Sequence, residues 1–121
     1  MIEQAFGVRL KQHYGLTESV VSISESRHGQ VHINEDFAAV ELVPVEGGLC
    51  EIVGTNLSNP AFPLVRYAAD DLVEPGGPCS CGLPDRTVTT LEGRREDNIV
   101  LPDGSRIRGI DHLVNDSIDI R

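Results

Sequence analysis

The chain has 121 residues, which corresponds to one ordinary domain or to a slice of a larger one. It carries 19 acidic and 10 basic residues, so nucleic-acid backbones and anionic membrane surfaces would repel it on average. No apolar run is long enough to span a bilayer, and the first residues lack the blocks of a signal peptide. We therefore expect a cytoplasmic protein without nucleic-acid or membrane partners.

Short segments with strand character follow one another, separated by turn compositions. After a helix tail over residues 1–7, strands are predicted at 8–12, 20–24, 31–33, 37–45, 49–55, 63–68 and 87–91. Stretches rich in Gly and Pro, such as Glu74 to Pro78, indicate chain reversals between them. This spacing, with an apolar supply of mostly Val, Ile and Leu, predicts a mainly β fold with minor α, built as a β-barrel-like unit of antiparallel meanders.

The last quarter of the chain has a different organisation. Pro102-Asp103-Gly104 is a hairpin signal, with strands predicted at 98–101 and 105–108. A turn of helix is expected at 111–115 and a strand at 118–120, where the chain stops with that strand barely begun. We therefore expect a piece of a longer protein, with a β-rich subdomain at 1–92 and a hinge plus the start of a small C-terminal domain at 93–121.

The segment from Tyr14 to Glu18 combines residue types that suit a nucleotide. The Tyr14 ring offers a stacking face for a base, and Gly15 lets the backbone approach a ligand closely. The Thr17 hydroxyl can donate to a phosphate oxygen, and Glu18 can hold the Mg²⁺ that accompanies ATP. Composition alone favours an ordinary corner between a strand and a turn.

Two later segments carry further charged side chains. Asp70 and Asp71 end a predicted strand, where a carboxylate can accept both hydroxyls of a ribose, or where the pair is simply a solvated turn. Arg94, Arg95 and Glu96 gather charges just before the hairpin. Taken alone, these three side chains would be a surface salt-bridge cluster that contributes little to stability.

In this order, the three segments resemble the adenylate-forming superfamily of acyl-CoA synthetases and ligases. The resemblance implies that Tyr14 packs on adenine beside Gly15, that Thr17 meets the α-phosphate and that Glu18 contacts Mg²⁺.

The same resemblance implies roles for the later segments. Asp71 would bind the ribose hydroxyls, Arg94 would lie near the ribose, and Glu96 would be the hinge residue of a rotating C-terminal domain. The chain departs from the family pattern in two places. Ala69-Asp70 stands where the family usually has Thr-Gly, and Glu96 stands where it more often has Asp.

Within the superfamily the chain is most similar to phenylacetate–CoA-ligase-like proteins, especially the branch of capsular polysaccharide biosynthesis proteins. Residues 27–37 and 99–107 carry this likeness. The resemblance implies an ATP-dependent acid–thiol ligase that joins a small carboxylate to AMP, releases pyrophosphate and passes the acyl group to coenzyme A.

The cysteines allow a second kind of site. Three cysteines do not make a disulfide framework, but Cys79 and Cys81 can form half of a metal site. The resemblance implies a structural zinc at positions 26, 32, 79 and 81, where this chain has Ser26, His32 and the two cysteines. Serine is a poor zinc ligand, so the tetrahedral set is short of one donor unless His28, Cys50 or water completes it.

Two elements that adenylation needs are absent from this sequence. The resemblance implies a phosphate-gripping loop upstream and a catalytic lysine downstream, but Lys11 is the only lysine and precedes the first motif. We therefore expect the chain alone to be inactive. Two alternatives stay open: a non-catalytic nucleotide-binding module and a zinc-stapled interaction module. Strand edges and apolar faces left bare would favour a homodimer.

Overall fold

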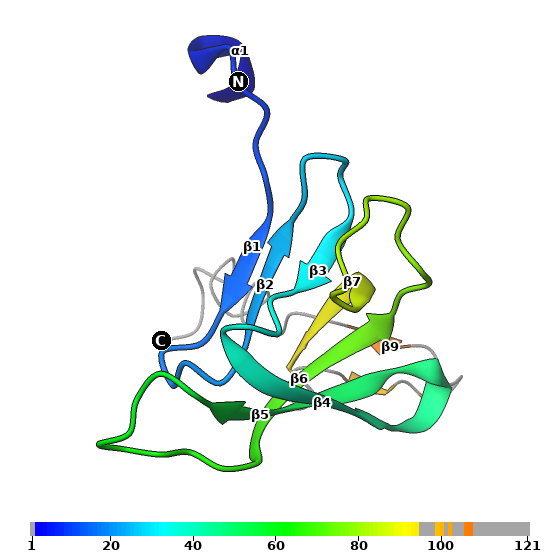
Figure 1. Cartoon of the computed structure of the whole chain (residues 1–121). Coiled ribbons are helices and arrows are strands. Elements are labelled where there is room, and N and C mark those ends of the chain that lie inside the picture. The colour runs from blue at the N-terminus through cyan, green and yellow to red at the C-terminus, as the bar shows by residue number, and fades with distance from the viewer. Residues whose placement is uncertain (1, 95–98, 101, 103–105, 108–121) are drawn as a thin grey trace, which may run out of the picture.

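The computed structural model describes residues 2–94, 99–100, 102 and 106–107, and every structural statement below concerns these residues. Seven strands form one antiparallel sheet and two more form a separate hairpin (Figure 1). The elements are α1 (Ile2–Phe6), β1 (His13–Gly15), β2 (Ser22–Glu25), β3 (Val31–Ile33), β4 (Ala38–Pro44), the short 3-10 helix η1 (Glu46–Gly48), β5 (Cys50–Asn56), β6 (Tyr67–Pro75), β7 (Thr87–Arg94), β8 (Ile99–Val100) and β9 (Arg106–Ile107).

The large sheet consists of two meanders joined at one place. Its strand order is β1-β2-β3-β7-β6-β5-β4, so β1 to β3 form one meander and β4 to β7 form the other. They meet where β3 pairs with β7, with Val31 opposite Val88 and His32 opposite Thr87. We call this β3–β7 pairing the seam.

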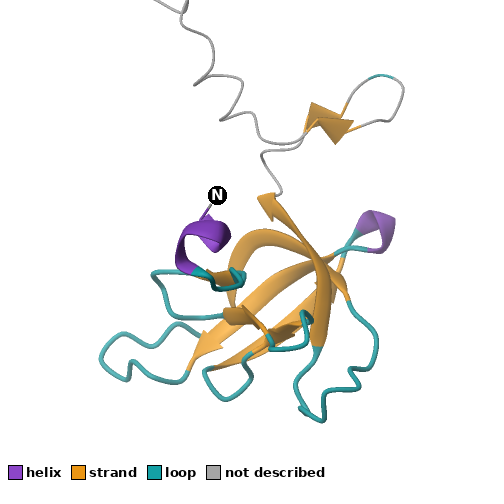
Figure 2. Ribbon diagram, turned by 90° about the horizontal axis from the view of Figure 1, so that it is seen from above, coloured by secondary structure: helices purple, strands orange, loops and turns teal. Residues whose placement is uncertain are grey.

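The sheet is strongly curved, as the view from above shows (Figure 2). Although β1 lies at one end of the strand order, its Tyr14 reaches Asp71 on β6. The connection after β1 also contacts β5: a Cβ atom added at Gly54 would lie 2.0 Å from the carbonyl oxygen of Val20. Glycine at position 54 is therefore needed for this close approach. The prediction of a mainly β fold with minor α is confirmed.

Branched aliphatic side chains fill the interior of the sheet. Strand β4 follows the period of two, with Ala38 and Val40 buried and Ala39 and Glu41 exposed. Full burial of a Val or Ile side chain contributes about 1.5–3 kcal/mol, so a small number of such residues holds the sheet together. The largest fully buried side chains are Val20, Val21, Ile23, Ile33, Ile52 and Val73.

Two predicted strands were wrong in position. The strand predicted at 8–12 instead runs over His13–Gly15, where it pairs with β2, and the pairing ends with the Glu25 N–H donating to the Gln12 carbonyl at 2.9 Å. The strand predicted at 63–68 begins at Tyr67 and continues to Pro75. It starts late because Arg66 has a left-handed backbone with φ of 51°, which interrupts an extended conformation.

Asp70 and Asp71 therefore lie inside β6 rather than at the end of a strand. Asp70 also has a positive φ, of 58°, where the pairing of β6 with β5 shifts register. This irregularity leaves Asp70 exposed while its neighbour Asp71 is buried.

The predicted hairpin around 102–104 is confirmed, since β8 and β9 pair antiparallel with Ile99 opposite Ile107. The helix predicted at 111–115 and the strand predicted at 118–120 lie outside the described residues. Most residues after 94 also lie outside them, so the division at 92/93 stays a prediction. In the part of the chain that the structure describes, no helix is long and apolar enough to cross a membrane.

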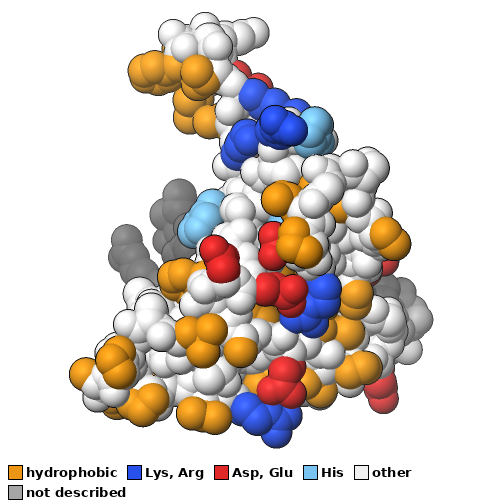
Figure 3. All heavy atoms as spheres, viewed as in Figure 1, with side chains coloured by type: hydrophobic (Ala, Val, Ile, Leu, Met, Phe, Trp, Pro, Cys, Tyr) orange, Lys and Arg blue, Asp and Glu red, His pale blue; other side chains and the backbone are white. Residues whose placement is uncertain are grey.

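The N-terminal residues form an arm that projects away from the sheet (Figures 1 and 3). Its apolar side chains Ile2, Phe6, Val8 and Leu10 are all more than half exposed. Within the described part of the chain, these apolar side chains are therefore not buried in the core of the sheet.

Candidate functional site

The curvature of the sheet brings together two residues of the predicted nucleotide site that lie 57 positions apart. The Tyr14 hydroxyl donates a hydrogen bond of 2.6 Å to Oδ2 of Asp71. Tyr14 is half-buried on β1, whereas Asp71 is buried on β6 with 7% of its surface exposed. A carboxylate this buried needs strong donors, and a phenol hydroxyl at this distance is one.

The surroundings of Tyr14 keep its hydroxyl protonated. Burial raises the pKa of Tyr14 well above its usual range, and the hydrogen bond to Asp71 and the negative charge of that carboxylate raise the pKa further. Arg94 acts in the opposite direction and lowers this pKa, while Glu18 raises it slightly. Three other predicted site residues, Asp71, Arg94 and Glu18, are thus close enough to act electrostatically on Tyr14.

Arg94 reaches this group through strand pairing. It stands opposite Asp71 in the register of β6 and β7, at the last position of β7. The register thus brings a positively charged residue to the strand pair that holds the buried carboxylate, and its charge acts on Tyr14. The predicted hinge residue Glu96 lies outside the described residues.

Thr17 and Glu18 lie in the turn that follows β1. The Thr17 hydroxyl donates to Oε2 of Glu18 at 3.1 Å, so the proposed phosphate donor and the proposed Mg²⁺ ligand contact each other. Both line an open pocket of about 250 Å³, together with Asn59, Phe62 and Leu64 from the β5–β6 connection. The part of the β5–β6 connection in this wall was not predicted from the sequence.

A second group of predicted residues comes together at the seam. His32 lies on β3, and Cys79 and Cys81 lie in the β6–β7 connection, with the candidate ligand atoms of all three within 4.8 Å of one another. Sγ of Cys81 is 3.5 Å from Nε2 of His32. With Zn–S near 2.3 Å and Zn–N near 2.0 Å, a tetrahedral zinc would hold these two atoms about 3.5 Å apart. Their spacing therefore fits a shared zinc ion.

The His32 ring is already oriented for such a role. Nδ1 lies 3.3 Å from the carbonyl oxygen of Asp85, to which a protonated Nδ1 donates. This contact leaves the lone pair of Nε2 directed at the two cysteines. The sequence pattern gave no sign of Asp85, because it acts through its backbone.

The two thiols differ in acidity. Cys81 has its pKa lowered by a hydrogen bond from the Cys79 thiol, by the backbone N–H of Leu83 and by the positive charge of Arg27. The pKa of Cys79 is raised by the same thiol–thiol hydrogen bond and by burial, although its sulfur also accepts the backbone N–H of Cys81 at 3.2 Å. Cys81 is thus the thiol that ionises first, and the thiolate is the form of cysteine that binds a metal.

Neither of the two side chains that were left open as a fourth ligand joins this group. Among the described residues, the His, Cys, Asp and Glu side chains that come together here are those of His32, Cys79 and Cys81, so His28 and Cys50 are not part of it. Nε2 of His28 accepts from Arg27 at 2.9 Å, and Cys50 is buried in the core of the sheet.

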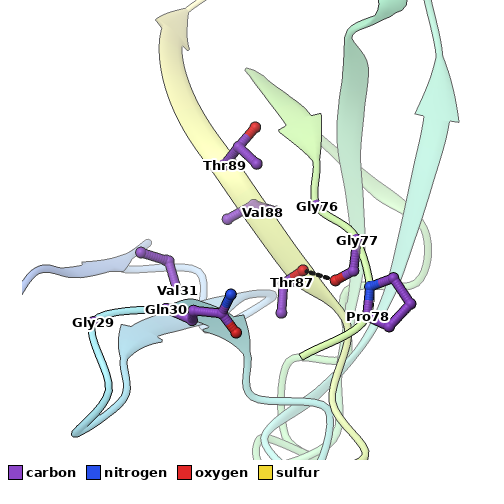
Figure 4. Close-up of a pocket in the computed structure, with 9 residues that line it drawn as sticks. All are labelled: Gly29, Gln30, Val31, Gly76, Gly77, Pro78, Thr87, Val88 and Thr89. Carbon is purple, nitrogen blue, oxygen red and sulfur yellow. Dashed lines mark hydrogen bonds between the residues drawn. The ribbon is translucent and has the colours of Figure 1, made fainter. Parts of the chain in front are cut away.

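A hollow of about 320 Å³ lies beside the seam and was not predicted (Figure 4). Its walls are Gly29–Val31 from the β2–β3 hairpin, Gly76–Pro78 after β6 and Thr87–Thr89 on β7. The Thr87 hydroxyl donates to the Gly77 carbonyl at 2.6 Å across this space, which holds the glycine segment against β7. A Cβ atom added at Gly76 would lie 2.2 Å from Oγ1 of Thr87, so glycine is needed at this position for the close packing on β7.

Comparison with known proteins places the chain near two curated proteins. It is 30% identical to the protein CapK of Staphylococcus aureus over 122 aligned residues, which cover 99% of this chain and 26% of CapK. It is also 30% identical to a phenylacetate-coenzyme A ligase of Pseudomonas putida over 113 residues, covering 83% of this chain and 25% of the ligase. No family model matches the chain.

These similarities are weak, but they extend over most of the chain and indicate a ligase-like origin. The chain spans about a quarter of the length of the curated relatives that it matches.

Proposed function

We propose that this chain forms the adenosine-binding side of an ATP-dependent acid–thiol ligase of the adenylate-forming type. The observation that carries the proposal is the contact between Tyr14 and Asp71, with Arg94 opposite Asp71 on the neighbouring strand. These three residues match the predicted adenine, ribose and ribose-proximal positions, and the ligase-like origin of the chain supports the same assignment.

Each side chain of this proposed site has a defined task. The Tyr14 ring stacks on adenine, and Asp71 accepts hydrogen bonds from the ribose hydroxyls. Thr17 releases its contact with Glu18 to donate to the α-phosphate, which frees the Glu18 carboxylate for Mg²⁺. Binding of the metal–nucleotide complex therefore replaces the Thr17–Glu18 hydrogen bond by a hydrogen bond to the phosphate and a contact between the Glu18 carboxylate and the metal.

Titration calorimetry with AMP and with ATP–Mg²⁺ tests this proposal. Tyr14→Phe keeps the stacking ring, whereas Tyr14→Ala removes it and is expected to weaken AMP binding about 5- to 150-fold, the range for one base–aromatic stack. Asp71→Asn is expected to weaken binding about tenfold or more, because a neutral amide accepts less strongly from the ribose. Asp70→Asn, on the exposed neighbouring residue, is the matched control and should bind like wild type. Equal affinities for the Asp70 and Asp71 variants would refute the proposed site.

The proposed chemistry of the parent enzyme is the joining of a carboxylate to AMP with release of pyrophosphate, followed by acyl transfer to a thiol such as that of coenzyme A. We expect no ATP–pyrophosphate exchange from this chain alone, because Lys11, its only lysine, precedes the motif. Exchange above background that disappears in Asp71→Asn would show instead that the chain catalyses the first step by itself.

A second candidate function is a zinc-stapled β module, favoured by the cluster of His32, Cys79 and Cys81 across the seam. Metal bound there would join the two meanders, and a ligand that binds only the folded state stabilises it. Metal analysis of the purified chain should then find zinc, and chelation should lower the melting temperature. A metal-free chain whose melting is the same with and without added zinc would remove this candidate.

A further inference from the structure

We propose that the metal site of His32, Cys79 and Cys81 has three protein ligands and a fourth position that is open to a small exogenous thiol. This inference rests on the second candidate function, metal binding by these three residues, and goes beyond it in assigning the fourth ligand. It follows from the position of Ser26, the exposure of the two cysteines and the charge of the group.

The position of Ser26 shows where the fourth ligand belongs. Ser24 stands directly opposite His32 in the β2–β3 register, and the backbone N–H of Ser26 continues this ladder by donating to Gln30 at 2.7 Å. Ser26 therefore lies on the same face of the hairpin as His32, as its diagonal neighbour, within reach of longer side chains. A donor at position 26 is thus well placed to complete the coordination of a metal held by His32.

Ser26 does not supply that donor. Its hydroxyl accepts the backbone N–H of His28 at 3.3 Å and so belongs to the turn. A neutral hydroxyl is also a weak ligand for zinc compared with thiolate, imidazole or carboxylate. In the described part of the chain, no further His, Cys, Asp or Glu side chain is close enough to take its place.

The open side of the site is accessible to solutes. Cys79 and Cys81 are both partly exposed, whereas His32 is buried beneath them. Cys79 also borders a hollow of about 420 Å³, which the chain from Pro75 to Thr87 partly encloses. A ligand with several heavy atoms can therefore approach the metal from the side of the cysteines.

The charge of the site is compatible with an anionic fourth ligand. A divalent cation with two thiolates and a neutral imidazole is neutral overall, so a third thiolate would bring the group to a charge of −1. The exposed Arg27 acts on Cys81 from close by and can offset this charge. Thiolate is also the ligand class that zinc-like cations prefer where two cysteines are already bound.

Cobalt(II) replacing zinc gives a direct readout, because zinc itself has no d–d absorption. We expect the wild-type chain to bind Co²⁺ with two cobalt–thiolate bonds. Saturation with 2-mercaptoethanol should then raise the thiolate-to-cobalt absorption by about half, since the number of such bonds rises from two to three. Desalting before and after the titration establishes that cobalt stays on the protein.

The variant Ser26→Cys closes the site from within the chain. It should show the higher absorption without added thiol, should not respond to 2-mercaptoethanol, and should hold the metal at least about tenfold more tightly. Ser58→Cys, in the exposed β5–β6 connection, adds a cysteine elsewhere and should behave like wild type. Cys81→Ser should abolish cobalt binding, and because Cys81 is partly exposed the variant keeps the fold.

Two results would overturn the proposal, and they are distinguishable. If the wild-type chain binds cobalt but its spectrum does not change with 2-mercaptoethanol, the fourth position does not accept an exogenous thiol. The proposed open position is then refuted, whereas metal binding by the three residues is not. If wild type and Ser26→Cys both fail to bind cobalt while their thermal melts show cooperative unfolding, the metal site itself is wrong.

Discussion

The hydrogen bond between Tyr14 and Asp71 joins β1 to β6 across the curved sheet, and its removal should be measurable in stability. Tyr14→Phe deletes the hydroxyl and leaves the Asp71 carboxylate, which is 7% exposed, without its 2.6 Å donor. Hydrogen bonds to charged groups contribute about 1.5–3 kcal/mol. Because Tyr14 is only half-buried, water can replace part of the contact, so the lower end of about 1.5 kcal/mol is expected.

Urea unfolding followed by circular dichroism measures this change. With an m-value of about 1.5 kcal/mol/M, the loss should lower the urea midpoint by about 1 M without changing the slope. Tyr67→Phe is the matched control, because Tyr67 lies on β6 with 36% of its surface exposed and surface changes stay within about 0.5 kcal/mol. The reasoning fails if the two tyrosine variants lose the same stability.

A double-mutant cycle with Asp71→Asn then isolates the pair. Residues in direct contact couple by about 0.5–3 kcal/mol, so the double variant should be more stable than the sum of the single losses indicates. A coupling energy near zero would mean that the Tyr14 hydroxyl stabilises the fold without acting through Asp71.

Three further results are expected. Since the folded state raises the pKa of Tyr14, the unfolded chain loses the phenol proton first as the pH rises. The free energy of unfolding should therefore fall above about pH 10, by at most about 1.4 kcal/mol per pH unit. In urea titrations at alkaline pH, Tyr14→Phe should show a smaller loss than wild type. Gly54→Ala should lower the melting temperature far more than Gly77→Ala. A Cβ atom added at Gly54 would lie 2.0 Å from a backbone oxygen, whereas one added at Gly77 meets nothing within 4 Å. Equal melting temperatures of the two variants would contradict the close packing at Gly54. The exposed arm should promote self-association, so Phe6→Ser should reduce the concentration dependence seen in sedimentation velocity, and an unchanged profile would exclude the arm as the contact.

The fold class followed from the sequence because the local signals were strong. Strand β3 was predicted with its observed bounds. Strand β4 was found from its long run of β-branched and apolar residues, and the β8–β9 hairpin from the Pro-Asp-Gly turn. The errors at β1 and β6 have different causes. Strand β1 lies where it pairs with β2, and this tertiary pairing is not encoded by local composition. Strand β6 begins only after the left-handed backbone of Arg66, a conformation that a non-glycine residue does not signal in the sequence.

The two candidate sites differ in how far the sequence could define them. The resemblance singled out Tyr14, Asp71 and Arg94, but the contact between the first two depends on the curvature of a sheet whose order places four steps between β1 and β6. The metal cluster was named as His32, Cys79 and Cys81. The place of its missing fourth ligand, however, follows from the β2–β3 register, which places Ser26 diagonal to His32. The roles of Asp85 and of the β5–β6 connection could not be predicted, because they arise from backbone position and not from side-chain type.

The division of the sheet into two meanders has a consequence for the order of folding. Within each meander, successive strands are neighbours in the chain, and hairpins of this kind form in about 1–10 μs. The seam joins residues near 31 to residues near 88, so it must close a long loop before any of its contacts form. We therefore expect the two halves to fold early and their union to set the overall rate, with substitutions at Val31 or Val88 slowing folding more than those in the hairpin turns.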